Sequence, residues 1–280
     1  MKLTILGCHS ATPRINTNPT SQVLEIKNHI FLIDCGEGTQ VELRRNKIKF
    51  SRIKHIFISH LHGDHYFGLI GLISTFRLLT RETDLHIYGP KGIKEAITLQ
   101  LKLGKSWTNY QLIFHELTAT ESIVIYEDDK VTVQTIPLKH RIYTNGFLFK
   151  ERQGERKLDI NAVLNANIDV AYYRKLKLGF DVINENGEVI INGDVTNEPN
   201  PIKSYAFCSD TAYTESILPI INEVTVLYHE STFIEKHAHL TEPTKHSSAI
   251  EAATIAKKAQ AGKLIWDIFQ LDMMIYHLLK

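Results

Sequence analysis

The sequence has little of three features that define whole classes of protein. It has only three cysteines among 280 residues, and their scatter argues against a disulfide framework. No apolar run approaches the ~20 residues of a membrane span, and we expect no signal peptide. The 32 Lys and Arg residues are balanced by 31 Asp and Glu. That balance excludes a uniformly basic nucleic-acid-binding surface but not a local basic patch, and we expect a cytoplasmic protein.

The hydropathy pattern predicts an α/β protein. Short apolar runs such as Ile30–Ile33 and Ile53–Ile58 predict strands, and the longer run Phe67–Leu79 predicts a buried helix. A later helix is expected over Ser247–Ala259, where Ser248 and Glu251 have capping-box spacing. Its buried face is expected to include Ile250, Ala253 and Ile255. Between these regions, residues 150–203 are rich in charge and Asn, which predicts an insertion that protrudes from the core; a flexible linker is the alternative.

The 14 histidines are the unusual count, and three of them fall in Ser59–His65, where a predicted strand meets a predicted helix. In an extended chain His60 and His62 project to the same side, and Asp64 and His65 follow a turn. Imidazole nitrogens and carboxylate oxygens bind zinc at ~2.0–2.2 Å. Solvated loop residues are the alternative, but four such side chains within six residues favour a metal site.

Two further pairs of residues fit the same site. His140 and Asp210 each follow a strand-like run, at the position where α/β sheets present functional groups. Alone, they would be a surface histidine and a helix N-cap, but beside the first segment they are candidate ligands. His246 is either a loop residue next to a helix or a functional group, and Glu230 is either a buried structural carboxylate or its partner.

The pattern His-x-His-x-Asp-His resembles that of the metallo-β-lactamase superfamily, and the chain is similar to its ribonuclease Z branch, the tRNA 3′-processing endonucleases. The resemblance implies a metallo-β-lactamase-type four-layer αβ/βα sandwich over residues 1–280, with 150–203 inserted as a tRNA-binding arm. It is carried by Phe31–Gln40, Tyr88–Pro90, Pro137–His140, Phe207–Thr211, His229–Phe233 and His246–Ala249.

The resemblance implies a zinc-dependent endonuclease that removes the 3′ trailer from precursor tRNA and leaves a 3′-hydroxyl on the tRNA. It further implies a homodimer with no membrane or DNA partner. Asp64 would orient the attacking water, and His246, oriented by Glu230, would be the general acid. Two Zn²⁺ per subunit would be held by His60, His62, Asp64, His65, His140 and Asp210.

The arm would recognise RNA by shape and phosphate, through Arg174, Lys175 and Lys177. The near-neutral net charge is compatible with that function if Lys and Arg concentrate on the arm. The arm departs from the family at Ala166–Ala171, where a Gly/Pro-rich stretch is usual, and Thr17 stands where an Arg is common.

The sequence departs from the family most at its end. The family's closing block carries a His as the seventh metal ligand, whereas this chain has Ile268 there, so the second zinc site is expected to be weakened and activity poor. We hypothesise a lost base near codon 266. Codons chosen for Trp266–Met273 can encode Gly-His-Phe-Ser-Ile-Arg-Tyr in a shifted frame, which would restore that block. A divergent tail is the alternative.

Two other functions stay open at this stage. One is a metallo-β-lactamase-fold hydrolase of a small ester or thioester, which would have no use for the arm. The other is a metal-poor homologue that binds tRNA or a partner subunit without cutting.

Overall fold

The computed structural model describes residues 1–12 and 15–268, which divide into two compact units. One unit joins residues 1–150 to the chain from Ser204 onward, and the other is Glu151–Lys203. Among the described residues, no helix is both long and apolar enough to span a bilayer. The predicted frame-shifted segment after Ile268 lies outside the described residues.

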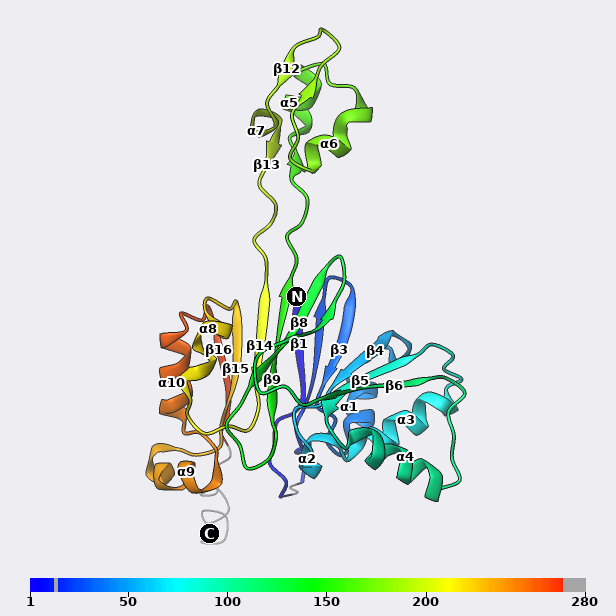
Figure 1. Cartoon of the computed structure of the whole chain (residues 1–280), viewed down its shortest axis with the longest axis vertical. Coiled ribbons are helices and arrows are strands. Elements are labelled where there is room, and N and C mark those ends of the chain that lie inside the picture. Colours follow the sequence, from blue (N-terminus) through cyan, green and yellow to red (C-terminus); the bar gives the residue numbers. More distant parts are fainter. Residues whose placement is uncertain (13–14, 269–280) are drawn as a thin grey trace. The chain divides into compact units, whose positions relative to one another are not determined.

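The first sheet has six strands in sequence order (Figure 1). β1 to β3 are antiparallel and β3 to β6 are parallel. The β2–β3 hairpin turns at Lys27 and Asn28, which both have positive φ, the geometry of the two-residue turn that matches strand twist. The strands are β1 (Lys2–Gly7), β2 (Ser21–Ile26), β3 (His29–Ile33), β4 (Ile53–Phe57), β5 (Leu85–Pro90) and β6 (Leu112–Leu117). The helices are α1 (Thr39–Arg45), η1 (Phe50–Arg52), α2 (Gly63–Tyr66), α3 (Gly68–Leu78) and α4 (Ile93–Leu103).

The second sheet has the order β16-β15-β14-β9-β8-β7. β14, β15 and β16 are parallel, and β9 lies antiparallel to β14. The strands are β7 (Val124–Glu127), β8 (Val131–Pro137), β9 (Asn145–Glu151), β14 (Ser204–Cys208), β15 (Val226–Ser231) and β16 (Leu264–Ile268). The helices are η3 (Glu215–Ile217), α8 (Leu218–Ile221), η4 (Glu235–Leu240), α9 (Thr241–Thr244) and α10 (Ala249–Lys258).

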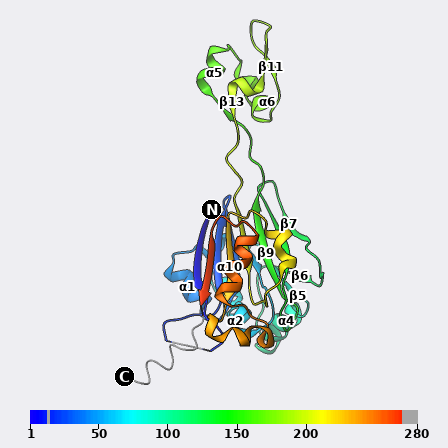
Figure 2. The ribbon, with the colours of Figure 1, turned by 90° about the vertical axis from the view of Figure 1, so that its left-hand side faces the viewer.

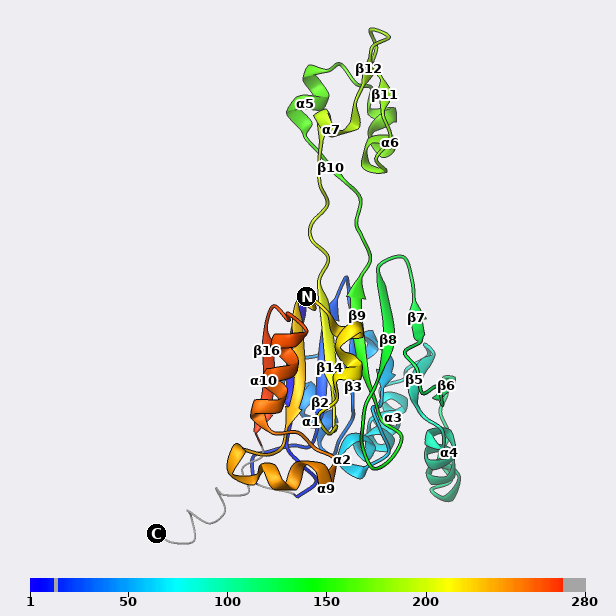
Figure 3. The ribbon, with the colours of Figure 1, turned by 60° about the vertical axis from the view of Figure 1, so that its left-hand side comes forward.

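Three apolar cores define four layers in this unit. Between the two sheets, Phe31 and Phe57 of the first pack with Phe147, Phe149 and Phe207 of the second. A second core lies between the first sheet and α1, α3 and α4, and a third between the second sheet and α8 and α10 (Figures 2 and 3). Burying each large apolar side chain contributes ~1.5–3 kcal/mol to the stability of the fold. Packing on both faces of each sheet therefore stabilises the sandwich. The predicted αβ/βα sandwich is confirmed.

The α10 helix begins as predicted, but only part of its predicted buried face is buried. Ser248 and Glu251 form the predicted capping box at its start. Ile255 is buried as predicted, whereas Ala253 is exposed and Ile250 is 56% exposed. Ile250 and Ile255 lie five residues apart, which is roughly 140° around a helix, so they cannot share one face. The box fixes where the helix begins, and the contact with β15 selects the face of Ile255 and Ala252.

Residues 151–203 form a small folded unit, so the flexible-linker alternative is wrong. Val163, Leu176 and Val195 are buried in its own apolar core. Its two ends meet, because the Glu151 amide donates to the Lys203 carbonyl at 2.9 Å. Its elements are β10 (Lys157–Leu158), α5 (Ile160–Asn165), η2 (Val170–Tyr172), α6 (Tyr173–Lys177), β11 (Val182–Ile183), β12 (Val189–Ile190), α7 (Asn192–Val195) and β13 (Thr196–Asn197).

Candidate metal centre

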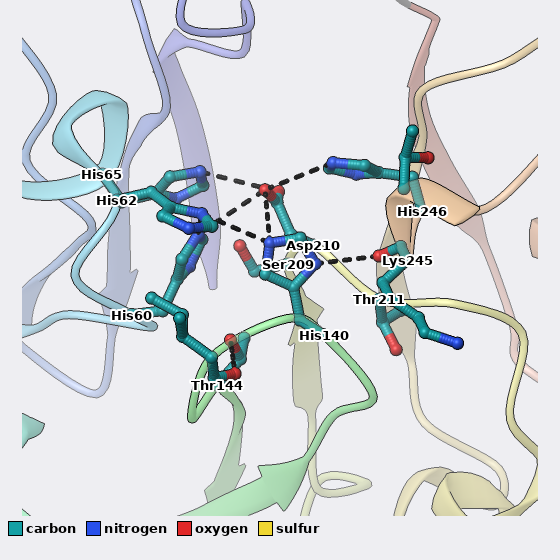
Figure 4. Close-up of polar contacts among 12 residues, drawn as sticks. His60, His62, His65, His140, Thr144, Ser209, Asp210, Thr211, Lys245 and His246 are labelled. Carbon is teal, nitrogen blue, oxygen red and sulfur yellow. Dashed lines mark hydrogen bonds and ion pairs between the residues drawn. The ribbon is translucent and has the colours of Figure 1, made fainter. Parts of the chain in front are cut away.

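Five ligand-type side chains converge where strands of both sheets end (Figure 4). His60 and His62 follow β4, and His65 lies in the short helix α2. His140 follows β8, and Asp210 follows β14. The apolar strands fix these loops from both sides, and therefore bring together residues that are 150 positions apart in the sequence.

Four of these side chains form a tight donor set. His60 Nε2 lies 3.0 Å from His62 Nδ1, which lies 3.3 Å from His140 Nε2. Asp210 Oδ2 lies 3.5 Å from His60 Nε2 and 3.8 Å from His140 Nε2. All four ligand atoms fall within 4.8 Å of one another. Three imidazole nitrogens and one carboxylate oxygen are a donor set that suits zinc.

A second group shares Asp210. His65 Nε2 lies 3.5 Å from Asp210 Oδ1 and 3.6 Å from Asp64 Oδ2. Asp210 therefore directs one oxygen to each group, which is the arrangement of a bridging carboxylate. The residues present fit two neighbouring cations, with fewer protein donors at the second position.

The ligand histidines are held from behind by other polar groups. His60 Nδ1 lies 3.0 Å from Ser59 Oγ, and His65 Nδ1 lies 2.7 Å from Asp34 Oδ2. The fully buried Asp34 also accepts the Ser59 amide at 2.7 Å and the Ser59 hydroxyl at 2.9 Å. Such outer contacts orient metal-binding histidines. Asp34 and Ser59 lie 25 positions apart with no motif joining them, so their role behind the histidines cannot be predicted from the sequence.

Electrostatics distinguishes the two groups. Burial, with the neighbouring His65, lowers the pKa of His60 well below its usual value, so His60 is held as the neutral imidazole that metal binding requires. Burial also opposes a proton on His65, but Asp210 and Asp34 raise the pKa of His65 well above its usual value. A cation at the second position must therefore displace a proton that the first position does not hold.

His246 and Glu230 form a separate pair beside these groups. Glu230 Oε1 lies 2.9 Å from His246 Nδ1 and accepts the Thr211 amide, and Oε2 accepts the Thr232 amide and hydroxyl. Asp210, Glu230 and His246 also lie close enough to hold a cation, but both Glu230 oxygens are already occupied by donors. Burial lowers the pKa of His246, but the hydrogen bond and charge of Glu230 raise it overall.

A cavity of about 350 Å³ opens over the centre. Asp64, Asp210 and His246 line it, together with Thr232 and Arg141. A single arginine in a loop carries no spacing signal, so the position of Arg141 at this cavity cannot be predicted from the sequence.

The predicted arm residues Arg174, Lys175 and Lys177 lie exposed on α6. The condition that Lys and Arg concentrate on the arm as a whole is not met. Residues 151–203 contain seven Lys and Arg against nine Asp and Glu. The positive charge there is local, because Asp and Glu predominate in 181–198 beyond α6.

Comparison with known proteins identifies the family. A family profile described as anti-Pycsar protein Apyc1 matches residues 1–159, which carry the first sheet and His60–His65. The ribonuclease Z of Bacteroides fragilis is 44% identical over 264 residues, which are 94% of this chain and 87% of that protein. The chain belongs to the ribonuclease Z family.

Other members and solved structures agree with this assignment. The ribonuclease Z of Cytophaga hutchinsonii is 44% identical over 265 residues, 94% of this chain and 84% of that protein. The crystal structure of the short form of human tRNase Z matches with a TM-score of 0.71 and 25% identity, over 95% of this chain and 92% of that one. The metallo-β-lactamase-fold protein YhfI of Bacillus subtilis matches with a TM-score of 0.64, at 16% identity over 98% and 89% of the two chains. The predicted family and the metallo-β-lactamase fold are confirmed.

Proposed function

We propose that this ribonuclease Z family member is an endoribonuclease that removes the 3′ trailer of precursor tRNA and leaves a 3′-hydroxyl. The single observation that carries the proposal is the convergence of two donor groups on Asp210, with the His246–Glu230 pair beside them at one cavity. Zn²⁺ is the cation that this histidine-rich set favours. The first ion would be held by His60, His62, His140 and Asp210, and the second by Asp64, His65 and Asp210.

The residues around the centre divide the proton transfers between them. Bound metal ions would supply water activation and charge neutralisation at the phosphate. The Asp64 carboxylate, which lines the cavity, accepts the proton of the attacking water. His246 donates a proton to the departing 3′-oxygen of the tRNA, and Glu230 keeps Nδ1 of that imidazole engaged so that Nε2 faces Asp210 at 4.0 Å.

The arm would bind a part of the RNA other than the bond that is cut. Arg174, Lys175 and Lys177 present an exposed positive cluster on one short helix. Phosphate contacts of this kind recognise RNA helices by shape. We also propose that the protein forms a homodimer and acts in the cytoplasm, as expected from the sequence.

The test is cleavage of an end-labelled precursor tRNA by the purified chain, with the zinc content measured on the same sample. We expect one cut at the trailer boundary and a tRNA 3′ end that accepts ligation. Hydrolysis of small thioesters without RNA cleavage would favour the ester-hydrolase alternative. Tight RNA binding without cleavage, at low zinc content, would favour the non-catalytic alternative.

A further inference from the structure

We propose that Arg141 binds the scissile phosphate of the RNA, an inference that rests on the proposed function. Arg141 directly follows the candidate ligand His140, so the loop after β8 that positions the imidazole also positions the guanidinium. Its side chain lines the same cavity as Asp64, Asp210 and His246. Of the described residues lining that cavity, it alone is a lysine or arginine.

The guanidinium of Arg141 is available to a ligand. Arg141 is exposed, and within the described residues it has no hydrogen-bond or ion-pair partner. The buried Arg81 shows the contrast, because its three nitrogens donate to backbone carbonyls at 2.7–2.9 Å. Arg81 is therefore structural, whereas Arg141 keeps its donors free.

A phosphodiester at the centre needs such a group. It is an anion with two non-bridging oxygens, and further charge develops on these oxygens during in-line attack. A guanidinium has planar paired donors that match two phosphate oxygens, and it stays charged at all relevant pH values. Thr17, which stands where the family commonly has an arginine, lines a different cavity with Arg45. Arg141 supplies a cation that Thr17 cannot.

The test compares Arg141→Met and Arg141→Lys with Lys139→Met as the matched control. Lys139 lies in the same loop with the same charge, but it does not line the cavity. Because hydrogen bonds to charged groups contribute roughly 10- to 100-fold in binding terms, we expect Arg141→Met to lower kcat/KM by about that factor. The loss should appear on precursor tRNA and on bis(p-nitrophenyl) phosphate alike. Arg141→Lys should recover part of it, and Lys139→Met should retain the wild-type rate on the small substrate.

Two measurements separate phosphate binding from structural damage. The metal content of Arg141→Met should equal that of the wild type. With metal removed by a chelator, its precursor tRNA affinity should show a salt dependence shallower by about one charge. An unchanged kcat/KM on both substrates, or loss of metal in Arg141→Met, would overturn the inference. A wild-type chain that does not cleave precursor tRNA would instead overturn the proposed function.

Discussion

At the candidate metal centre, separate hydrogen bonds orient the imidazole rings of His60 and His65. Ser59 faces Nδ1 of His60 and Asp34 faces Nδ1 of His65, which leaves Nε2 of each ring pointed at Asp210. A change at either histidine therefore removes a donor atom whose orientation is set by its own hydrogen bond.

We expect His60→Ala to release metal and reduce cleavage by several orders of magnitude, because the activated nucleophile depends on the centre. His62→Ala should behave alike. Metal content and precursor tRNA cleavage are measured together, with His239→Ala as the control because His239 is exposed outside the donor groups. Near-normal zinc and rate in either ligand variant would refute the assignment.

His246→Gln should slow cleavage by ~10²–10⁴-fold and leave the metal bound, since its proposed task is proton donation. Glu230→Gln should slow the reaction in the same direction, because the amide no longer holds His246 Nδ1 by charge. Single-turnover cleavage and zinc content are the measurements. Zinc loss in His246→Gln would mean that this residue is a ligand and not an acid.

The spacing of residues in the sequence predicts the candidate metal ligands. It does not predict the residues that hydrogen-bond to these ligands from behind. His60, His62, Asp64 and His65 share one short segment, so chemistry and spacing coincide. The Asp34–Ser59 contact joins the ends of β3 and β4, and it exists only once those parallel strands are paired. Arg141 acquires its meaning from the cavity alone.

At the scale of elements, strands and helices with buried faces were predictable. The helix predicted over Phe67–Leu79 is α3, which spans Gly68–Leu78. The short α1 buries only Thr39 and Leu43, which is too few for a period to show. Edge strand β6 carries His115 and Glu116 among its apolar residues, and only its register with β5 reveals it.

The β4 strand carries a half-buried histidine, His55, from which we predict acid sensitivity. Burial and the neighbouring His86 lower the pKa of His55 to about 3. As the pH decreases below 6.5, His55 takes up a proton in the unfolded chain but not in the folded chain. The free energy of unfolding therefore decreases as the pH decreases in this window. The loss at pH 5 is up to about 2 kcal/mol.

His55→Phe keeps an aromatic ring beside Tyr126 and should remove this pH dependence. The measurement is urea unfolding of both proteins at pH 7 and pH 5, with chelator present so that metal loss does not contribute. His239→Phe is the control. Because His239 is exposed, this substitution should leave the difference in unfolding free energy between pH 7 and pH 5 unchanged. Parallel pH dependence in His55→Phe and wild type would contradict the prediction.

The last described strand bears on the missing ligand. The backbone of β16 pairs in parallel with β15, and Ile268 stands beside Ser231 at the carboxyl end of both. We predict that Ile268→His raises the metal content, because it adds a donor where the family has one. Equal content in variant and wild type would contradict this. Nucleotides at codons 263–275 that cannot encode Gly-His-Phe-Ser in the shifted frame would independently refute the frame hypothesis.

At the scale of the whole molecule, the two units permit a clean deletion. Because Glu151 and Lys203 are hydrogen-bonded to each other, a short Gly-Ser linker can replace residues 152–202. The deletion should weaken precursor tRNA binding strongly and leave hydrolysis of bis(p-nitrophenyl) phosphate near the wild-type rate. Replacing Arg174, Lys175 and Lys177 by Gln should give the same pattern more weakly. Equal loss of both activities would show that the arm supports the core.

The meeting of Glu151 and Lys203 also sets an order of events during synthesis. β9 has to wait for its neighbour β14, and the chain between them is the whole arm. At about 5–20 residues per second, a ribosome takes several seconds to make that stretch. The arm has its own apolar core, so it can fold while β9 is paired with β8 but still lacks β14. Asp210, which follows β14, therefore joins the histidines of the first sheet only after the arm has been synthesised.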